Sequence, residues 1–455
     1  MENNKLTKKY GLLTAICMVV GIVIGSGIFF KGQAILEHTK GNLWLSILAW
    51  AVGGIVMIIC SAQFAVMATK YEKVNGVVDY AEATCGKRYA YYLGWFATTI
   101  YYPAMTSVLA WVSARYFGVL FGWHLASANV MALAGFFLIM SFVVNALSPK
   151  VAGYFQVSTT IIKLIPLILM AIVGVIAGLA NGNLEQNFIG DAISQTAGGN
   201  ELFAAVCATA FAYEGWIIAT SINSEIKNSK KNLPIALVIG ALIVVIIYIL
   251  YNVAITGGAP TSAVIKDGAT VAFYNLFGKV GGAILNVFIV ISCLGTLNGL
   301  MLGCSRGLYS IAIRDEGPMP KLFSQVDSQT NMPSNSSIFA LLVCGVWFIY
   351  FFGANLTDVS WFGAFSFDSS ELPIITIYAL YIPMLVLWII KSKEEGVFKR
   401  FILPILAILS CLFLMLVAVV SHKISVVYYL IIFAVIMLIG FFFSADFKKL
   451  ISKKK

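Results

Sequence analysis

Long apolar runs, separated by short polar or Pro- and Gly-rich breaks, dominate this chain of 455 residues. A helix needs about 20 consecutive apolar residues to cross the hydrocarbon core of a bilayer. The pattern therefore predicts an all-α membrane protein with twelve transmembrane helices and no soluble domain. The predicted spans cover residues 11–36, 42–68, 89–121, 126–146, 153–180, 200–222, 234–256, 271–312, 337–353, 362–390, 400–420 and 425–444.

The composition agrees with a membrane protein. Hydrophobic residues make up 60% of the chain and charged residues 11%, and the mean hydropathy is +0.91, which excludes a soluble globular protein. The third and eighth runs exceed one bilayer crossing, so we expect tilted helices that extend beyond the hydrocarbon. Residues 1–9 are polar and show no signal-peptide pattern, so we expect the first span to be retained.

Lys and Arg residues fall mainly on one side of the predicted membrane. With the N-terminus inside, 22 of the 30 lie in the two tails and the inner loops, and positive segments of this kind resist translocation. We therefore expect both termini to be cytoplasmic in a multi-pass protein of the plasma membrane. This bias accounts for the net charge of +10, which needs only lipid headgroups as partners and no nucleic acid.

The cysteines and histidines show no pattern of a metal site or an enzyme. At least seven of the eight Cys lie in predicted spans and Cys85 lies in a cytoplasmic segment, so we expect no disulfide, metal ion or cofactor. His38, His124 and His422 fall near the outer face, far apart in the sequence. The absence of zinc-protease and nucleophile motifs argues against an intramembrane enzyme, and no stretch resembles a channel's selectivity filter.

Two predicted spans are interrupted at their middles by small or polar residues. The first contains Gly25 to Gly27, and the sixth contains Phe211 to Gly215. An interrupted helix frees N–H and C=O groups that lipid cannot satisfy, so a break is tolerated where it lines a cavity or binds a ligand. Breaks in corresponding places of two halves predict the binding site of a transporter.

The first break suits both ends of an α-amino acid. If the helix unwinds at Gly25, Ser26 and Gly27, the outer half-helix begins with free N–H groups and a positive dipole end, which favour a carboxylate. The inner half-helix ends with free carbonyls near Val23 and Ile24, which favour an ammonium group. The alternative is a helix contact between small residues, because glycines at positions 21 and 25 are four apart.

The second break adds candidate contacts from the sixth span. Carbonyls near Phe211 and Ala212 could complete the ammonium site. Phe211 or Trp216 could close over the ligand, although aromatic residues in spans more often only pack. Glu214 costs about 3 kcal/mol inside a span and normally faces a cavity or a partner. The alternative for Glu214 is a local hydrogen bond near the outer vestibule.

Lys163 is the other costly residue. It lies about 12 residues into the fifth span, or roughly 18 Å at 1.5 Å per residue, which is too deep for its stem to reach the surface. Its ammonium must find carbonyls, hydroxyls or a carboxylate inside the bundle, which predicts a functional site unless the lysine is purely structural. Candidate partners in other spans are Tyr248, Ser292, Thr296 and Asn298.

The two breaks lie about 190 residues apart, which predicts two five-helix repeats followed by two helices. An odd number of spans inverts the second repeat, as in many secondary transporters with a site near the midplane. We expect the first repeat and the N-terminal tail in residues 1–190 and the second repeat in residues 191–395. Helices 11 and 12 and the C-terminal tail would then occupy residues 396–455.

Three motifs resemble the amino acid–polyamine–organocation superfamily and, within it, the L-amino-acid transporter family. Residues 21–29 are similar to the first-helix pattern G-x-x-I-G-S-G-I-F, and residues 211–216 to the segment F-A-Y-[GDE]-G-W. Residues 292–299 resemble the eighth-helix pattern S-x-x-G-x-x-N-G, followed by Arg306 and the break at residues 317–320. The resemblance covers nearly the whole chain and is strongest to bacterial exchangers of serine and threonine or of alanine, serine and cysteine.

This resemblance implies a LeuT-like fold of 5+5 inverted repeats, with helices 1 and 6 unwound at the midplane. The substrate would bind backbone at Ile24 to Gly27 and at Phe211 and Ala212, and Phe211 would form the outer lid. Coupling and gating roles are implied for residues of other helices. Lys163 would take the place of a sodium ion and bridge the first and eighth helices with Ser292, Tyr248 would support the cytoplasmic gate, and Asn298 would belong to the same group.

We therefore expect a secondary transporter, not an enzyme, that exchanges small neutral L-amino acids without sodium by alternating access. One alternative is a proton-coupled symporter in which Lys163 loses its proton. Another is a transporter of larger neutral or cationic amino acids, which Glu214 leaves open. Animal members of the family bind a heavy chain through a cysteine in the outer loop between helices 3 and 4. Residues 121–129 contain no cysteine, so no disulfide-linked heavy chain is expected.

Overall fold

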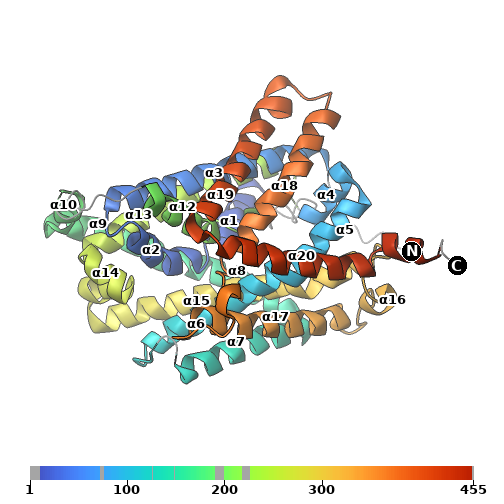
Figure 1. Cartoon of the computed structure of the whole chain (residues 1–455). Coiled ribbons are helices and arrows are strands. Elements are labelled where there is room, and N and C mark those ends of the chain that lie inside the picture. Colours follow the sequence, from blue (N-terminus) through green and yellow to red (C-terminus); the bar gives the residue numbers. More distant parts are fainter. Residues whose placement is uncertain are drawn as a thin grey trace. The chain divides into compact units, whose positions relative to one another are not determined.

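The computed structural model describes residues 11–71, 76–124, 127–147, 149–189, 199–217, 226–330 and 332–452. The elements in these ranges are helices (Figure 1), which confirms the all-α prediction for the described part of the chain. Within these described ranges, eight helices are long and apolar enough to cross a membrane. They are α3 (Leu43–Lys70), α7 (Ala128–Leu147), α13 (Ser229–Gly258), α15 (Thr270–Ala312), α17 (Ser334–Asn355), α18 (Leu372–Lys391), α19 (Leu403–His422) with the preceding η4 (Phe398–Ile402), and α20 (Ser425–Phe443).

The other four predicted spans are built from shorter helices, so the total of twelve stays a prediction. They correspond to α1 (Leu12–Val23) with α2 (Gly27–His38), α5 (Lys87–Phe96) with the π-helix η1 (Ala97–Tyr101) and α6 (Tyr102–Val119), α8 (Pro149–Ile162) with α9 (Leu164–Ala180), and α12 (Gly199–Ala212). A bend of 82° separates α9 from α10 (Asn183–Ile189). The remaining short helices are α4 (Val77–Cys85), α14 (Thr261–Asp267), α16 (Pro320–Phe323), η3 (Gly363–Phe365) and α21 (Ala445–Ser452).

Two long spans differ from their predicted form. The eighth was expected as one tilted helix, but Gly278 has φ +67° and ψ −178°, so α15 consists of two helices joined across a kink. The tenth was expected from residue 362, but α18 begins only at Leu372. Asp368 terminates the preceding loop, because its Oδ1 accepts hydrogen bonds from the backbone N–H groups of Ser370 at 2.6 Å and Glu371 at 3.2 Å. The hydropathy pattern does not reveal this turn, because the loop that precedes α18 is itself rich in aromatic residues.

The chain divides into two compact units, each assembled from three separate segments. The first unit contains residues 1–85, 160–288 and 378–421, and the second contains residues 86–159, 289–377 and 422–455. These units interleave along the sequence, whereas the predicted repeats are consecutive stretches. The division into two units follows contacts between residues and does not test the boundaries of the two repeats. Those boundaries therefore stay a prediction.

In the first unit, the break-bearing helices pack against each other and against α3 and α13. Helix α13 contacts α1, α3 and α9, and α12 contacts α2 and α3. The approach of α9 to α13 is close enough to require glycine, since a Cβ on Gly174 would lie 2.5 Å from the carbonyl oxygen of Ala254. Small residues thus let α13, which carries Tyr248, and α9, which begins directly after Lys163, pack backbone to backbone.

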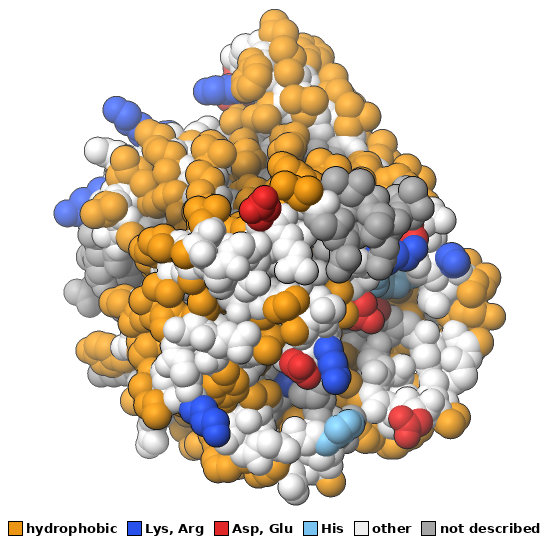
Figure 2. All heavy atoms as spheres, turned by 90° about the vertical axis from the view of Figure 1, so that its left-hand side faces the viewer, with side chains coloured by type: hydrophobic (Ala, Val, Ile, Leu, Met, Phe, Trp, Pro, Cys, Tyr) orange, Lys and Arg blue, Asp and Glu red, His pale blue; other side chains and the backbone are white. Residues whose placement is uncertain are grey.

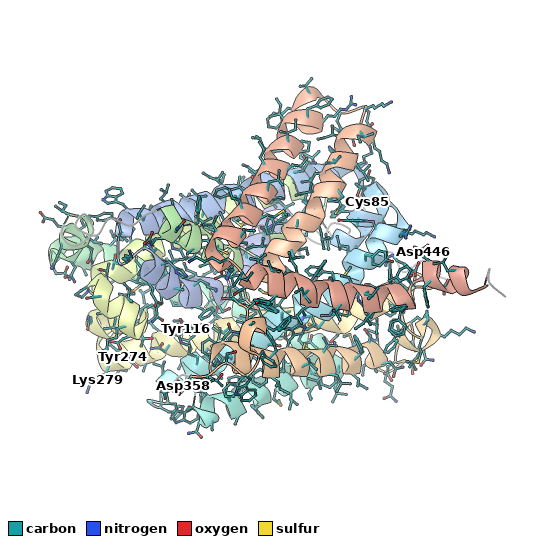
Figure 3. All side chains as sticks on the ribbon, in the orientation of Figure 1. Cys85, Tyr116, Tyr274, Lys279, Asp358 and Asp446 are labelled. Carbon is teal, nitrogen blue, oxygen red and sulfur yellow. The ribbon has the colours of Figure 1, made fainter. Side chains whose placement is uncertain are left out.

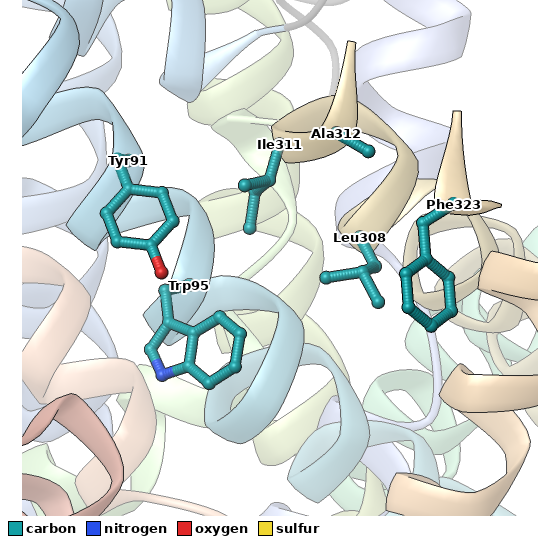
Figure 4. Packing of buried hydrophobic residues seen from close by; sticks show 6 residues of the cluster. All are labelled: Tyr91, Trp95, Leu308, Ile311, Ala312 and Phe323. Atoms are coloured by element: carbon teal, nitrogen blue, oxygen red, sulfur yellow. The ribbon is translucent and has the colours of Figure 1, made fainter. Parts of the chain in front are cut away.

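In the second unit, α6 packs against α7 and α17, and α20 packs against α5. A buried cluster at one end of this unit joins α5, α15 and α16, as Figure 4 shows. The Tyr91 hydroxyl donates to the carbonyl of Gly440 at 2.6 Å, and Trp95 Nε1 donates to the carbonyl of Ile436 at 2.9 Å, which fixes α20 on α5. The cluster consists of Tyr91, Trp95, Leu308, Ile311, Ala312 and Phe323.

The surface agrees with contact to lipid. Figure 2 shows hydrophobic side chains over much of one face, with charged side chains of both signs interspersed among them. Exposed leucines along α19 and α20 include Leu409, Leu416 and Leu438. Asp446, labelled in Figure 3, pairs with Arg88 at 2.7 Å and attaches α21 to the start of α5.

Candidate functional site

The first break lies where the glycine-rich tripeptide predicts it. Helix α1 ends at Val23, Ile24 is extended with φ −68° and ψ 106°, and α2 begins at Gly27. Because the helix stops, the last carbonyls of α1 and the first N–H groups of α2 lose their partners within a continuous helix. Ser26 between the two helices is buried, and its Oγ has no hydrogen-bond partner within the described structure.

Lys163 binds one of these released carbonyls. It lies between α8 and α9, is only 1% exposed, and its ammonium donates a hydrogen bond to the carbonyl oxygen of Gly21 in the last turn of α1. A cation at the C-terminal end of a helix also interacts favourably with the helix dipole. The lysine therefore stabilises the broken end of α1, 142 residues away in the sequence.

Tyr248 of α13 joins the ends of the two broken helices. Its hydroxyl lies 3.1 Å from the carbonyl oxygen of Val23, where α1 ends, and 3.1 Å from that of Ala212, where α12 ends. A phenol carries one proton, so it donates fully to one carbonyl at a time. The side chain is fully buried. Tyr248 is thus a shared contact of both breaks.

The second break begins after Ala212. Residues 213–215 form a turn, with Gly215 at φ +106°, and residues 216–217 are in 3-10 conformation. The rest of the predicted span, residues 218–222, lies outside the described residues. The Tyr213 hydroxyl donates to the carbonyl of Trp50 at 2.8 Å, and Trp216 Nε1 donates to the hydroxyl of Tyr378 at 3.0 Å. These two hydrogen bonds hold the turn against α3 and α18.

The two breaks touch each other through Gly27. A Cβ at this position would lie 2.5 Å from the Cα of Ala212, so only glycine allows this approach. The rings of Phe211 and Phe30 pack edge to face with centroids 5.8 Å apart. The N-terminus of α2 and the C-terminus of α12 therefore meet, with the predicted lid residue Phe211 beside them.

Glu214 is placed inside the first unit and is 8% exposed. Glu214 belongs to the turn that Tyr213 attaches to α3 and Trp216 attaches to α18. Its alternative assignment to a local hydrogen bond near an outer vestibule remains untested.

Ser292 and Asn298 lie in the second unit, on α15. Asn298 Oδ1 accepts a hydrogen bond from Asn145 Nδ2 at 2.9 Å, which joins α15 to α7. The Ser292 carbonyl accepts from Thr296 Oγ1 at 3.2 Å. Their implied connection to Lys163 stays a prediction, because Lys163 belongs to the other unit. The expected lack of a metal or cofactor is likewise a prediction.

Some members of this site carry no sequence signal. Trp50 packs against Tyr213 with ring centroids 5.6 Å apart and against Tyr248 at 5.3 Å. In the sequence it is one aromatic residue in an apolar run and looks like ordinary packing. Tyr213 falls inside the second break, but nothing in the sequence indicates that its hydroxyl reaches α3. Asn145 could have been proposed as a partner only because it is a buried amide in a span.

Two broken helices whose ends meet inside an all-helical membrane protein are typical of secondary transporters. The chain belongs to the amino acid permease family, whose model matches residues 10–442. This family assignment agrees with the superfamily that the sequence motifs indicate.

Similar proteins cover most of the chain. The serine/threonine exchanger SteT of Bacillus subtilis is 29% identical over 408 residues, which span 89% of this chain and 88% of SteT. The b(0,+)-type amino acid transporter 1 of Mus musculus is 28% identical over 454 residues, spanning 98% of this chain and 90% of the relative. The crystal structure of MhsT in complex with L-phenylalanine has the same fold, with a TM-score of 0.58, 15% identity, and coverage of 91% of this chain and 100% of MhsT.

Proposed function

We propose that this protein is a sodium-independent exchanger of small neutral L-amino acids that works by alternating access. The observation that carries the proposal is the meeting of two broken helix ends at the Tyr248 hydroxyl, with the N-terminus of α2 beside them. This arrangement offers hydrogen-bond donors and acceptors within a few ångströms of each other, as a zwitterion requires. The exchangers among the similar proteins support the same reaction.

The carboxylate of the substrate would bind at the start of α2. The first N–H groups of that helix point toward the break, and the buried Ser26 hydroxyl adds a further donor. A helix N-terminus also favours a negative charge through its dipole. A carboxylate bound here would accept hydrogen bonds from these N–H groups, which have no acceptor within the helix.

The ammonium group would bind the carbonyls at the ends of α1 and α12. The carbonyls of Val23 and Ala212 already face the Tyr248 hydroxyl, and each oxygen can accept a second hydrogen bond through its other lone pair. Ile24 and Phe211 contribute the neighbouring carbonyls. A bound amino acid would therefore connect both breaks, so that substrate occupancy and the movement of the two helix ends depend on each other.

Lys163 would make the exchange independent of sodium. Its ammonium is a fixed positive charge at the carbonyl end of α1, which supports the role that the family resemblance gives it. A bridge from this ammonium to Ser292, and a gating role for Tyr248 and Asn298, belong to the same proposal. We also propose the twelve-helix inverted-repeat topology with repeats at residues 1–190 and 191–395, a plasma-membrane location with cytoplasmic termini, and activity without a disulfide-linked heavy chain.

A proton-coupled symporter is the second candidate. Glu214 and Lys163 are buried ionisable groups at the two breaks, and either could carry a proton through the cycle. Glu214 also supports a variant of the first proposal in which the substrates are larger or cationic. The two candidates differ in whether uptake needs an amino acid on the opposite side of the membrane.

Liposome uptake distinguishes these candidates. Purified protein is reconstituted, and uptake of labelled L-serine or L-alanine is measured without sodium, with and without unlabelled amino acid inside. Exchange predicts uptake only into loaded liposomes, at equal pH on both sides. Uptake into empty liposomes that grows with an inward proton gradient would instead establish symport, and uptake that requires sodium would contradict the role proposed for Lys163.

A further inference from the structure

The segment between α17 and α18 is strongly apolar, yet it does not form part of a membrane-crossing helix. The sequence predicts the tenth span from residue 362, whereas α18 begins only at Leu372. Residues 356–367 contain one charged residue, Asp358, and no Lys or Arg. Four of their large apolar side chains are exposed, namely Val359, Trp361, Phe362 and Phe365. We call residues 359–365 the aromatic loop, and exposed apolar side chains gathered in this way indicate a contact surface.

The backbone in and beside the aromatic loop is hydrogen-bonded to α17. The Tyr350 hydroxyl of this helix donates to the carbonyl of Phe365 at 2.8 Å and accepts from the N–H of Phe367 at 2.9 Å. The N–H of Trp361 donates to the carbonyl of Gly353 at 3.0 Å. Backbone groups that are paired in this way need no water, so the loop can lie at the edge of the hydrocarbon, where unpaired groups would be costly.

The length of α17 places the loop at the boundary of a bilayer. This helix has 22 residues and is roughly 33 Å long at 1.5 Å per residue, close to the hydrocarbon thickness of about 30 Å. The rings of Trp361 and Phe352 pack with centroids 5.2 Å apart, and a Cβ on Gly353 would lie 2.7 Å from Trp361 Cε3. The indole therefore lies within one turn of the helix end, at the level where hydrocarbon meets headgroups.

The loop also continues an apolar face of α17. Exposed apolar side chains recur along this helix at Ile338, Leu342, Val346 and Ile349. This spacing places them on one side of the helix, the side available to lipid. Phe352 follows three residues later, so Trp361 packs over the end of this face. On its other side the loop packs on α20, where the rings of Phe365 and Tyr428 have centroids 5.1 Å apart. Lipid that covers this face of α17 would therefore also meet the loop.

We propose that the aromatic loop anchors the second unit at the membrane interface, with phospholipid as its partner. The Trp361 ring would pack against the upper part of the acyl chains. Its indole N–H, which has no acceptor in the described part of the chain, would donate to an ester carbonyl of the lipid. Because the loop lacks Lys and Arg, it would not select anionic headgroups. In the proposed topology this interface belongs to the outer leaflet, and the inference does not depend on amino acid exchange.

Fluorescence quenching by brominated lipids tests this placement. The full-length protein is reconstituted in phosphatidylcholine vesicles with bromine either near the top or near the end of the acyl chains. The difference between wild type and Trp361→Phe gives the Trp361 signal. We expect bromine near the top of the chains to quench this signal most, and we expect the same result when phosphatidylglycerol replaces part of the phosphatidylcholine.

Trp347→Phe is the matched control on the same helix. Trp347 is buried and its Nε1 donates to the carbonyl of Thr99 at 2.8 Å, so the signal lost in this variant should be quenched little by either lipid. If Trp361→Phe does not fold, Val359→Trp gives a second reading. Val359 is 81% exposed, so the added indole should also be quenched most by bromine near the top of the chains.

Each of four results would overturn the proposal. A loop signal that iodide in water quenches and neither lipid quenches would place the loop in water. A signal that no quencher reaches would mean that protein, such as a second copy of this chain, covers the loop. Strongest quenching by bromine near the chain ends would place the loop inside the hydrocarbon. Quenching that requires phosphatidylglycerol would show selection of anionic headgroups.

Discussion

Replacing Tyr248 by phenylalanine should separate the ends of α1 and α12. The substitution removes one oxygen and keeps the ring, so the packing against Trp50 at 5.3 Å and against Tyr213 at 5.2 Å is retained. What is lost is the hydroxyl that lies 3.1 Å from the carbonyls of Val23 and Ala212. The variant therefore tests a hydrogen bond and not a cavity.

The size of the expected effect follows from the number of hydrogen-bond donors that the substitution removes. A hydrogen bond contributes about 0.5–1.5 kcal/mol net, and a buried carbonyl left without a donor costs about 1–3 kcal/mol. Tyr248 has one proton, so one carbonyl at a time loses its donor, and the expected cost is about 1–2 kcal/mol. Since about 1.4 kcal/mol corresponds to a factor of ten, exchange should fall about tenfold if the bond is made in only one state of the cycle.

The assay is the initial rate of alanine exchange in liposomes, normalised to folded protein. Tyr429→Phe is the matched control, since Tyr429 is also buried and its hydroxyl contacts Thr376 Oγ1 at 2.7 Å within the second unit, whereas both breaks belong to the first unit. Both variants should lose a similar amount of thermal stability, but only Tyr248→Phe should slow exchange. Equal exchange rates in the two variants would refute the idea that Tyr248 couples the breaks.

Three further predictions concern single residues. Gly27→Ala should abolish exchange, because the new Cβ would lie 2.5 Å from the Cα of Ala212. Gly32→Ala in the same helix meets no atom within 4 Å and should remain active. Equal activity of the two variants would contradict the close approach of α2 to α12 at Gly27. Lys163→Met should lower the melting temperature and stop exchange, because the Gly21 carbonyl loses a charge-assisted bond of about 1.5–3 kcal/mol; a fully active, stable variant would show that the lysine is dispensable. Lys70 donates a hydrogen bond to Glu394, which lowers the pKa of the Glu394 carboxyl below its ordinary value of 4.5. The pair therefore stabilises the fold at pH values above 4.5, and this stabilisation is lost as the pH falls through the lower pKa of the folded state. The melting temperature, measured from neutral to acidic pH, should show this loss in the wild-type protein and not in Glu394→Gln. If the melting temperatures of the two proteins fall in parallel with pH, the pair is not the cause.

The sequence predicts features that depend on local composition. The apolar runs predict the helical class and eight of the long helices, because a lipid-crossing helix must be continuous and apolar over its length. The ends of α1 and α2 fall at Gly25 to Gly27 because small residues offer little resistance to unwinding. The start of α18 was misplaced because the Asp368 turn is a hydrogen-bonding feature inside an aromatic stretch.

The contacts of the site depend on pairs of residues far apart in the sequence. Lys163 was recognisable as a buried cation, but its acceptor, the Gly21 carbonyl, is a backbone atom with no sequence signature. Tyr248 was one of several polar residues in spans, and its contact with both breaks follows only from the fold, which packs α13 on α1 and brings the Tyr248 hydroxyl to the Ala212 carbonyl. Lys31 carries no sequence signal of its contact with Phe211, whose ring centroid lies 5.5 Å from its Nζ.

The interleaving of the two units constrains how the protein can be made. The first unit needs residues 378–421, so a ribosome must synthesise most of the chain before this unit can close. The Trp216 to Tyr378 hydrogen bond spans 162 residues, and the Lys70 to Glu394 pair spans 324. Contacts of such long range form slowly and late. A nascent chain that ends before α18 therefore lacks Tyr378, so Trp216 at the second break stays without this hydrogen-bond partner until α18 has been made.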